Sequence, residues 1–191
     1  METPLSVYRK LANGPYSYLF ESVEGGENWA RYSLIGLEAS QIIFLNKNQI
    51  EIELNGKIIE SFHCDDPLEY IDKLHKSFDL KKNNNLPIFN GGLVGYFGYD
   101  CVRYIESKLV DSEPPDTIGT PDALFMISDE VAVFDNLKNK LHLIVLVESE
   151  DDQEKANIRL DKLEDTLKES LPFEDFNKPV KSIEETDFVS G

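Results

Sequence analysis

The stretch QIIFLNKNQIEIELNGKIIESF, residues 41–62, decides the fold class of this chain. It contains three runs rich in isoleucine and other strand-forming residues, and short polar turns separate them. The second turn is Asn55-Gly56, a strong hairpin signal because both residues tolerate the positive φ angles of a two-residue turn. The stretch therefore predicts three consecutive antiparallel strands.

The same pattern continues toward the amino terminus. Residues 16–36 read YSYLFESVEGGENWARYSLIG, two extended segments separated by turn residues, which predicts a β-hairpin with a wide loop. The first third of the chain is thus expected to be one antiparallel meander. Before it, Thr3 and Pro4 form a helix start and Asn13-Gly14 a helix stop, which predicts a helix over residues 4–12.

The remaining two thirds alternate helical and extended patterns. Apolar residues recur at helical spacing over residues 66–78 and 152–170, and a third helix is expected over 100–109. Further strands are predicted in residues 86–100, 123–127, 130–136 and 140–147. Because strands outnumber helices and short turns join most of them, the predicted fold class is α+β, an antiparallel sheet system with helices packed on it.

The chain divides into a folded part and a polar end. We expect one domain over residues 1–171, large enough to form its own core without disulfides or metals. Residues 172–191, PFEDFNKPVKSIEETDFVSG, are polar and marked by prolines, which predicts an interdomain linker.

Composition narrows the classes of function. A formal net charge of -17 disfavours a nucleic-acid partner, because the chain repels phosphate backbones. No window approaches the roughly 18 apolar residues of a membrane span, so we expect a soluble, cytoplasmic protein with no membrane partner. Cys64 and Cys101 stand alone in the sequence, which predicts two reduced thiols and no metal site in this chain.

The glycine run GGLVGYFG, residues 91–98, invites a nucleotide-binding interpretation. It lacks the G-x-G-x-x-G spacing, and no lysine-serine or lysine-threonine pair follows it. We predict a packing motif, in which the glycines allow close approach and Tyr96, Phe97 and Tyr99 supply rings. The three histidines are far apart and none lies beside a nucleophile in a known motif, so no catalytic residue is predicted.

Two stretches carry a family resemblance. Residues 16–36 and FNGGLVGYFGYDCVRYIE at 89–106 resemble the amino-terminal region of anthranilate synthase component I. In that family a strand ending L-L-E-S, an E-G-G-E loop and an R-Y-S-x-I-G strand recur, and G-G-x-V-G-Y-F-G-Y-D-x-V-R follows later. The resemblance extends from about Thr3 to about Val147, and Phe20 stands where the family usually has leucine.

The resemblance implies a role in tryptophan biosynthesis. Family members convert chorismate to anthranilate and pyruvate, take ammonia from a glutamine amidotransferase subunit, and are inhibited by tryptophan bound between two halves. Chorismate and magnesium bind in the carboxy-terminal half. The resemblance therefore implies that this chain is the amino-terminal, regulatory domain of a two-part α/β sandwich enzyme, inactive alone and without a cofactor of its own. Residues 172–191 would lead toward the chorismate-binding domain.

The resemblance also implies inhibitor contacts. These are Glu21 and Ser22, with Pro4 close by and Arg31 a weaker candidate from the facing strand. Tryptophan needs an acceptor for its ammonium, donors for its carboxylate and an apolar slot for its ring, and this strand end offers each of them. In a regular strand Glu21 and Ser22 point to opposite faces, so one acts through its backbone or the strand bulges. The alternative is that Ser22 caps the turn and Glu21 pairs with Arg31 at the surface.

Two other functions remain open at this point. Aminodeoxychorismate synthase component I shares the architecture, although ESVEGGENWARYS and VGYFGYD favour the anthranilate branch. The third hypothesis, from a different class, is a free-standing binding or interaction module. The reading frame beyond Gly191 distinguishes them, because a chorismate-binding domain there supports an enzyme and a stop codon supports a module.

Overall fold

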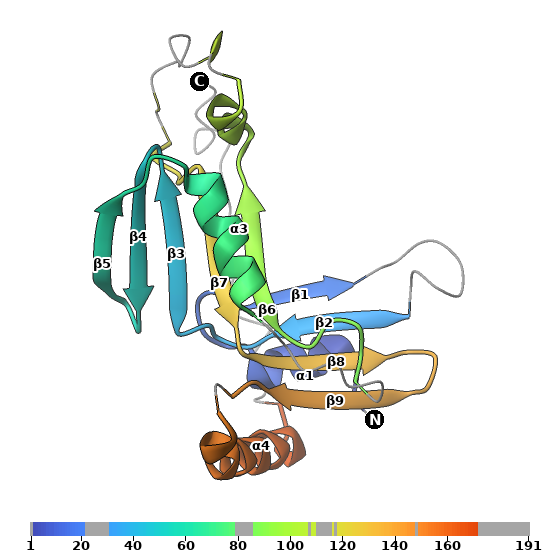
Figure 1. Ribbon diagram of the computed structural model, residues 1–191. Helices are drawn as coiled ribbons and strands as arrows, with labels where there is room; N and C mark the ends of the chain where they lie inside the picture. Colours follow the sequence, from blue (N-terminus) through green and yellow to red (C-terminus); the bar gives the residue numbers. More distant parts are fainter. Residues whose placement is uncertain are drawn as a thin grey trace, which may run out of the picture.

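Two antiparallel sheets make up most of the structure, and their strands run in different directions (Figure 1). The computed structural model describes residues 2–21, 31–78, 86–106, 108–109, 116, 118–147 and 149–171. The four-stranded sheet has the order β1 (Tyr18–Glu21), β2 (Tyr32–Gly36), β8 (Glu130–Asp135), β9 (Lys140–Val145). The five-stranded sheet has the order β5 (Lys57–His63), β4 (Gln49–Leu54), β3 (Gln41–Asn46), β7 (Ala123–Ser128), β6 (Gly92–Phe97).

The helices cover these sheets, which confirms the α+β prediction. They are α1 (Pro4–Leu11), α3 (Pro67–Ser77) and α4 (Gln153–Lys168), with short 3₁₀ segments η1 (Tyr99–Tyr104) and η3 (Glu150–Asp152). Local sequence explains where the first two begin, since the side chains of Thr3 and Asp66 accept hydrogen bonds from backbone amides of the first turns of α1 and α3.

The expected single meander is wrong, because the chain changes sheets between β2 and β3. Residues 37–40 make this crossing, and Asp129 alone separates β7 from β8 at a second one. The two crossings are joined where the amide of Leu37 donates to the carbonyl oxygen of Glu130 over 3.1 Å. β8 pairs with β2 and β7 with β3, so strands from the second half of the chain separate the two halves of the expected meander.

The helix expected over residues 100–109 is also different, since it is the short 3₁₀ helix η1. The sequence placed Asp100 and Arg103 three residues apart, and the structure joins them in an ion pair. A spacing of three matches the 3₁₀ helix, in which residues i and i+3 lie above one another. Cys101 is the buried residue of this turn, so η1 anchors one end of β6.

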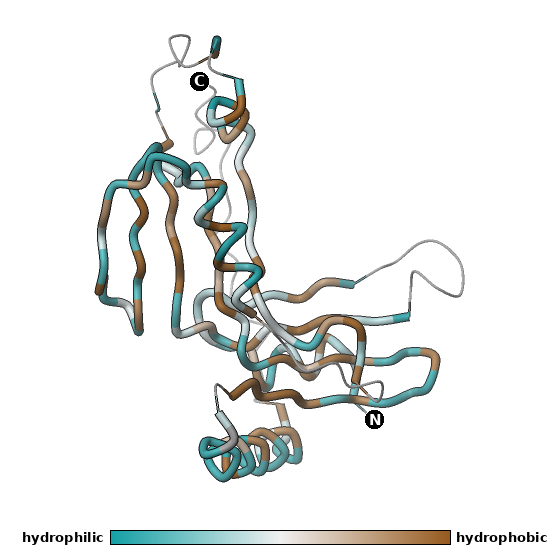
Figure 2. The backbone as a smooth tube through the Cα atoms, in the orientation of Figure 1, coloured by the Kyte–Doolittle hydropathy of each residue, from teal (hydrophilic) through white to brown (hydrophobic). Residues whose placement is uncertain are grey.

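Each sheet has its own core. On the five-stranded sheet, α3 and η1 pack over Ile43, Leu45, Ile50 and Ile52 through Ile71 and Cys101. On the four-stranded sheet, α1 and α4 cover one face, and their cluster comprises Val7, Ala12, Ile35, Leu37, Ala132, Phe134 and Leu163. The other face holds Val131, Val133 and Ile144, covered in part by Leu86 and Phe89. Figure 2 shows apolar residues recurring along β3 and β8, the buried strands of the two sheets.

The glycine run is a packing motif, as its spacing predicts. A Cβ at Gly95 would collide with the carbonyl oxygen of Leu124 on β7, so only glycine allows β6 to approach this closely. The ring of Phe97 packs edge-on against Phe125, with 4.9 Å between the centroids. Tyr99 does not supply a packed ring, because it is 90% exposed.

Two sequence-level expectations concern cysteines and membranes. Both cysteines are free thiols, and burial raises the pKa of the Cys101 thiol above its usual range. No helix in the described part of the chain has the length and apolar character needed to cross a bilayer.

Candidate functional site

Three of the predicted site residues, Pro4, Glu21 and Arg31, lie in the described part of the chain, next to the four-stranded sheet. Helix α1 packs on β1 and β2, and residues 12–17 turn the chain back from the end of α1 into the start of β1. The first turn of α1, which begins at Pro4, therefore lies at the end of the sheet where β1 finishes at Glu21 (Figure 1). The structure thus brings Pro4 and Glu21 to one end of the sheet.

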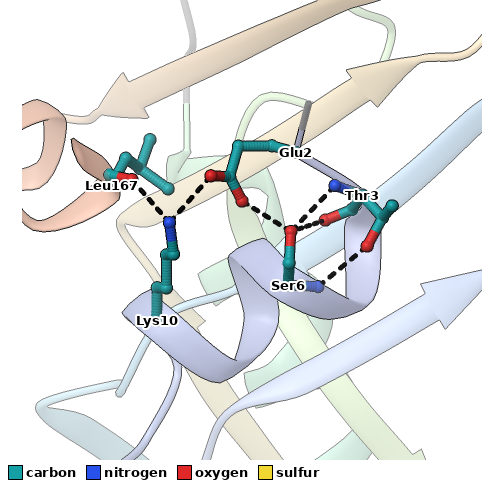
Figure 3. Close-up of polar contacts among 5 residues, drawn as sticks. All are labelled: Glu2, Thr3, Ser6, Lys10 and Leu167. Atoms are coloured by element: carbon teal, nitrogen blue, oxygen red, sulfur yellow. Dashed lines mark hydrogen bonds and ion pairs between the residues drawn. The ribbon is translucent and has the colours of Figure 1, made fainter. Parts of the chain in front are cut away.

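A network of polar contacts fixes the first turn of α1 (Figure 3). Thr3 and Ser6 form a capping box, in which the Ser6 amide donates to Thr3 Oγ1 at 3.1 Å and the Thr3 amide to Ser6 Oγ at 2.8 Å. Ser6 Oγ also donates to Glu2 Oε2 at 2.5 Å. Two of the helix's orphan amide groups are thereby satisfied, and Pro4 occupies a first turn with defined geometry.

Lys10 ties this network to α4. Its Nζ lies 2.7 Å from Glu2 Oε1 and 2.7 Å from the carbonyl oxygen of Leu167, in the last turn of α4 (Figure 3). The Lys10 side chain is only 9% exposed. The Lys10 ammonium, followed by the Ser6 hydroxyl, holds the pKa of the Glu2 carboxyl below its usual value. The start of α1 and the end of α4 are therefore fixed relative to each other.

Glu21 lies on the face of the sheet that α1 and α4 cover. Leu19, two residues earlier on the same face, packs against the core cluster beneath α1. Glu21 is paired in register with Ser33 of β2, and Ser33 Oγ donates to Glu21 Oε1 at 3.5 Å. Ser33 is 3% exposed, and its hydroxyl accepts a hydrogen bond from Asn136 Nδ2 at 3.3 Å. Glu21 itself is exposed, so its carboxylate lies at the edge of the core with one oxygen over a buried hydroxyl.

Arg31 has a different partner from the one the sequence suggested. Its Nε and Nη2 donate to the two carboxylate oxygens of Asp135 at 3.1 and 2.7 Å, and its guanidinium lies 4.8 Å from the centre of the Tyr32 ring. The alternative in which Glu21 pairs with Arg31 is therefore wrong. Whether Arg31 contacts an inhibitor stays a prediction, but its guanidinium is engaged with Asp135.

The Arg31–Asp135 pair strongly perturbs the carboxyl group. Asp135 is 2% exposed and also accepts the Lys138 amide at 3.0 Å. The guanidinium of Arg31, followed by this amide, lowers the pKa of Asp135 to about 2. The same pair raises the pKa of Arg31. Asp135 thus holds the turn between β8 and β9 and fixes the start of β2.

Ser22, the other predicted contact, lies outside the described residues. Whether Ser22 acts through its backbone or at a bulge in the strand therefore stays a prediction. Phe20, on the face opposite Glu21, is 53% exposed and stacks on Tyr18 with 4.8 Å between the ring centroids. The apolar surface that β1 offers at this end is thus on the face away from α1.

Sequence reasoning missed Ser33, Asn136 and Asp135. Ser33 is the serine of the R-Y-S motif, but no local sequence pattern shows that it is paired with Glu21. Asp135 and Arg31 lie 104 residues apart, and only the pairing of β2 with β8 brings them together. Buried polar residues in otherwise apolar strands are the signal that could have identified Ser33 and Asp135.

Other parts of the surface offer less defined sites. Hollows of about 580 and 570 Å³ lie at the turn between β3 and β4 and at the junction of the two sheets. In the part of the chain that the structure describes, no three His, Cys, Asp or Glu residues are grouped so that they could hold a metal ion. The end of the four-stranded sheet is therefore the place where the predicted residues and a perturbed carboxylate meet.

Comparison with known proteins places the chain in a family. The family model described as chorismate binding enzyme matches residues 17–189, which is most of the chain. The chain belongs to the chorismate-binding enzyme family. The match includes residues 17–36 and 89–106, and therefore the end of β1.

Proteins similar to this chorismate-binding family member include anthranilate synthase component 1 from several bacteria. The chain is 45% identical over 172 residues to anthranilate synthase component 1 from Pseudomonas aeruginosa, covering 89% of this chain and 35% of the relative. It is 47% identical to the protein of that name from Pseudomonas putida, with the same coverage. The crystal structure of anthranilate synthase component I from Streptococcus pneumoniae TIGR4 matches with a TM-score of 0.59 and 25% identity, over 90% of this chain and 36% of that one.

These matches confirm the resemblance to anthranilate synthase component I. They also set its extent, since the chain spans about a third of the length of the curated relatives. The α+β fold agrees with that of the structural relative.

Proposed function

We propose that this chain is the amino-terminal regulatory domain of an anthranilate synthase component I and carries part of its tryptophan feedback site. The observation that supports this most strongly is the 45% identity to relatives of that name, confined to about a third of their length. The family match over residues 17–189 includes the end of β1. Residues 172–191 would then form the linker to a chorismate-binding domain.

The proposed whole enzyme converts chorismate and ammonia to anthranilate and pyruvate, in the first step of tryptophan biosynthesis. Ammonia comes from a glutamine amidotransferase subunit. Chorismate and magnesium are bound by the domain beyond this chain, so the chain contributes no catalytic group and no cofactor. Its share of the enzyme is the inhibitor site and the surface that meets the other domain.

The chemistry at the sheet end suits an amino acid. The Glu21 carboxylate is the acceptor proposed for the tryptophan ammonium, because it is exposed and makes no ion pair with any described residue. Ser22 is proposed to bind the charged backbone group of tryptophan, and Pro4 borders the site from the first turn of α1. Arg31 is the weakest of the four contacts, since binding the ligand carboxylate requires it to share or leave Asp135.

An activity assay on this chain tests directly whether the catalytic groups lie in the other domain. With chorismate, magnesium and ammonia supplied, we expect no anthranilate, which is followed by its fluorescence. The full-length protein under the same conditions is the positive control. Anthranilate formation by the chain alone, above a blank without protein, would show that the catalytic groups are here and that the proposal is wrong.

A further inference from the structure

Ser33 is a polar residue in a buried and mostly apolar environment. It lies on β2 between β1 and β8, and it is 3% exposed. The next residue on the same face, Ile35, is fully buried, and the residue paired with Ser33 on β8 is Phe134. A hydroxyl in such surroundings destabilises the fold unless it is hydrogen-bonded. The partners that satisfy Ser33 therefore indicate what it does.

The hydrogen bonds of Ser33 have a direction. Asn136 is held in place because its amide donates to the Arg31 carbonyl oxygen over 2.7 Å. Its side-chain Nδ2 donates to Ser33 Oγ at 3.3 Å. Because Ser33 Oγ accepts from Asn136, its own proton is available for Glu21 Oε1, 3.5 Å away. The two hydrogen bonds thus connect Asn136, in the turn between β8 and β9, through Ser33 to the Glu21 carboxylate.

The contact with Glu21 directs the carboxylate without neutralising it. At 3.5 Å the hydrogen bond is at the long limit for this type, so it is weak. The nearby cation, Arg31, is bound to Asp135 through both carboxylate oxygens. Glu21 is thus exposed, makes no ion pair with Arg31, and has one carboxylate oxygen in contact with the Ser33 hydroxyl.

We propose that Ser33, supported by Asn136, is a positioning residue that orients the Glu21 carboxylate toward the ammonium group of an amino acid bound at this sheet end. The inference rests on the proposed function, because it assigns Glu21 to the tryptophan ammonium. Ser33 does not touch the ligand. It acts by limiting the orientations of Glu21, so that less freedom is lost when the ammonium binds.

Ser128 provides a matched comparison within the same chain. It is 2% exposed and shares a hydrogen bond of 2.8 Å with the Tyr18 hydroxyl, which joins β7 to β1. Like Ser33 it is a buried serine on a strand, but its partner is a phenol of the core and not a surface carboxylate. Replacing Ser128 by alanine therefore removes a buried hydroxyl that makes no hydrogen bond to Glu21.

The test uses the full-length protein and the tryptophan concentration that halves anthranilate formation, measured against each variant's own uninhibited rate. We expect Ser33→Ala to raise this concentration about 3- to 10-fold, because one weak hydrogen bond to a charged group is lost. Asn136→Ala, at the exposed turn, should raise it by a smaller factor in the same direction. Ser128→Ala should leave it unchanged.

The outcomes separate the inference from the proposed function. If Glu21→Gln abolishes inhibition but Ser33→Ala leaves it unchanged, the function stands and the positioning role is wrong. If Ser33→Ala does not fold, Asn136→Ala decides, and an unchanged half-inhibiting concentration overturns the role. If tryptophan does not inhibit the wild-type protein, or if Glu21→Gln has no effect, the assignment of Glu21 itself fails.

Discussion

The pair of Arg31 and Asp135 shows how one residue contact joins distant parts of the chain. Two N–H groups of one guanidinium meet two oxygens of one carboxylate that is 2% exposed. Such bidentate pairs are among the stronger polar contacts in proteins. Here the pair connects the start of β2 to the turn after β8 and leaves Glu21 without a cationic neighbour from β2.

The Arg31–Asp135 pair predicts that the free energy of unfolding decreases in acid. Since the pKa of Asp135 is lowered to about 2, its contribution is present above the ordinary value of 3.8 and is lost as pH falls toward 2. We expect Asp135→Asn to lower the free energy of unfolding at pH 7 by at most about 2 kcal/mol. Urea unfolding at pH 7 and pH 3 measures this, and the difference from wild type should shrink at pH 3.

Asp165→Asn is the control, because Asp165 pairs with Lys168 in an exposed ion pair on α4. Its unfolding curve should match that of wild type at both pH values. An Asp135→Asn variant as stable as wild type at pH 7 would show that burial of the pair cancels its attraction.

Motifs in the sequence indicated the residues proposed for the site, but not the partners that the fold gives them. The motif around residues 16–36 indicated Glu21 and Arg31, and the helix signal at Thr3 indicated the first turn beside Pro4. The alternative of a Glu21–Arg31 pair is wrong because facing strands leave several acceptors within reach of a long arginine side chain, and Arg31 binds Asp135. Asp135 is one of them only through the β2–β8 pairing, which no local pattern specifies.

At the scale of elements, α1 is held by contacts that its own sequence predicts only in part. The capping box of Thr3 and Ser6 is local, but the bond from Lys10 to the last turn of α4 spans 157 residues. Helix α1 has only eight residues, too few for independent stability in water. Its position therefore depends on α4 as well as on the sheet.

Lys10→Met should accordingly destabilise the chain. The change removes two hydrogen bonds made by the ammonium of a side chain that is 9% exposed, and it leaves Glu2 without its ion-pair partner. We expect a loss of about 1 to 3 kcal/mol in the free energy of unfolding. Lys168→Met is the matched control, since the Lys168 side chain is 69% exposed and its replacement should leave the free energy of unfolding close to that of wild type. Equal midpoints for the two variants in thermal unfolding would contradict this account of α1.

The elements themselves were largely predictable, whereas their assembly was not. Apolar periodicity and turn residues located every strand and the helices α1, α3 and α4 to within a few residues. The break between β2 and β3 was missed because residues 37–40 look like an ordinary turn. What separates those strands is the pairing of β7 and β8 with them, and those residues come some 80 positions later. Local sequence specifies strands, but long-range burial selects their partners.

At the scale of the whole molecule, large apolar side chains remain at the surface. Phe20 and Phe97 are each 53% exposed, Tyr99 is 90% exposed and Ile105 is 72% exposed. Tyr99 begins η1 and Ile105 follows its last residue, and η1 comes shortly after the end of β6. In the proposed enzyme, the other domain would cover part of this surface.

The isolated chain should therefore self-associate. Sedimentation at rising protein concentration should show species larger than a monomer, and a hydrophobic dye should bind, because exposed apolar patches favour association. The net charge of -17 opposes association at low salt, so the effect should grow as salt screens it. A strictly monomeric chain that binds no dye at high salt would contradict the prediction.

The central claim is that tryptophan is sensed where β1 ends, and an inhibition curve for the full-length protein tests it most directly. Ser22→Ala removes the hydroxyl proposed to bind the charged backbone group of tryptophan. A hydrogen bond to a charged group contributes roughly 1.5 to 3 kcal/mol, so the half-inhibiting concentration of tryptophan should rise about 10- to 150-fold. Ser22→Arg should weaken inhibition further, because it also fills the space. If the curves of wild type and Ser22→Ala coincide, Ser22 only caps a turn and the sensing site is elsewhere.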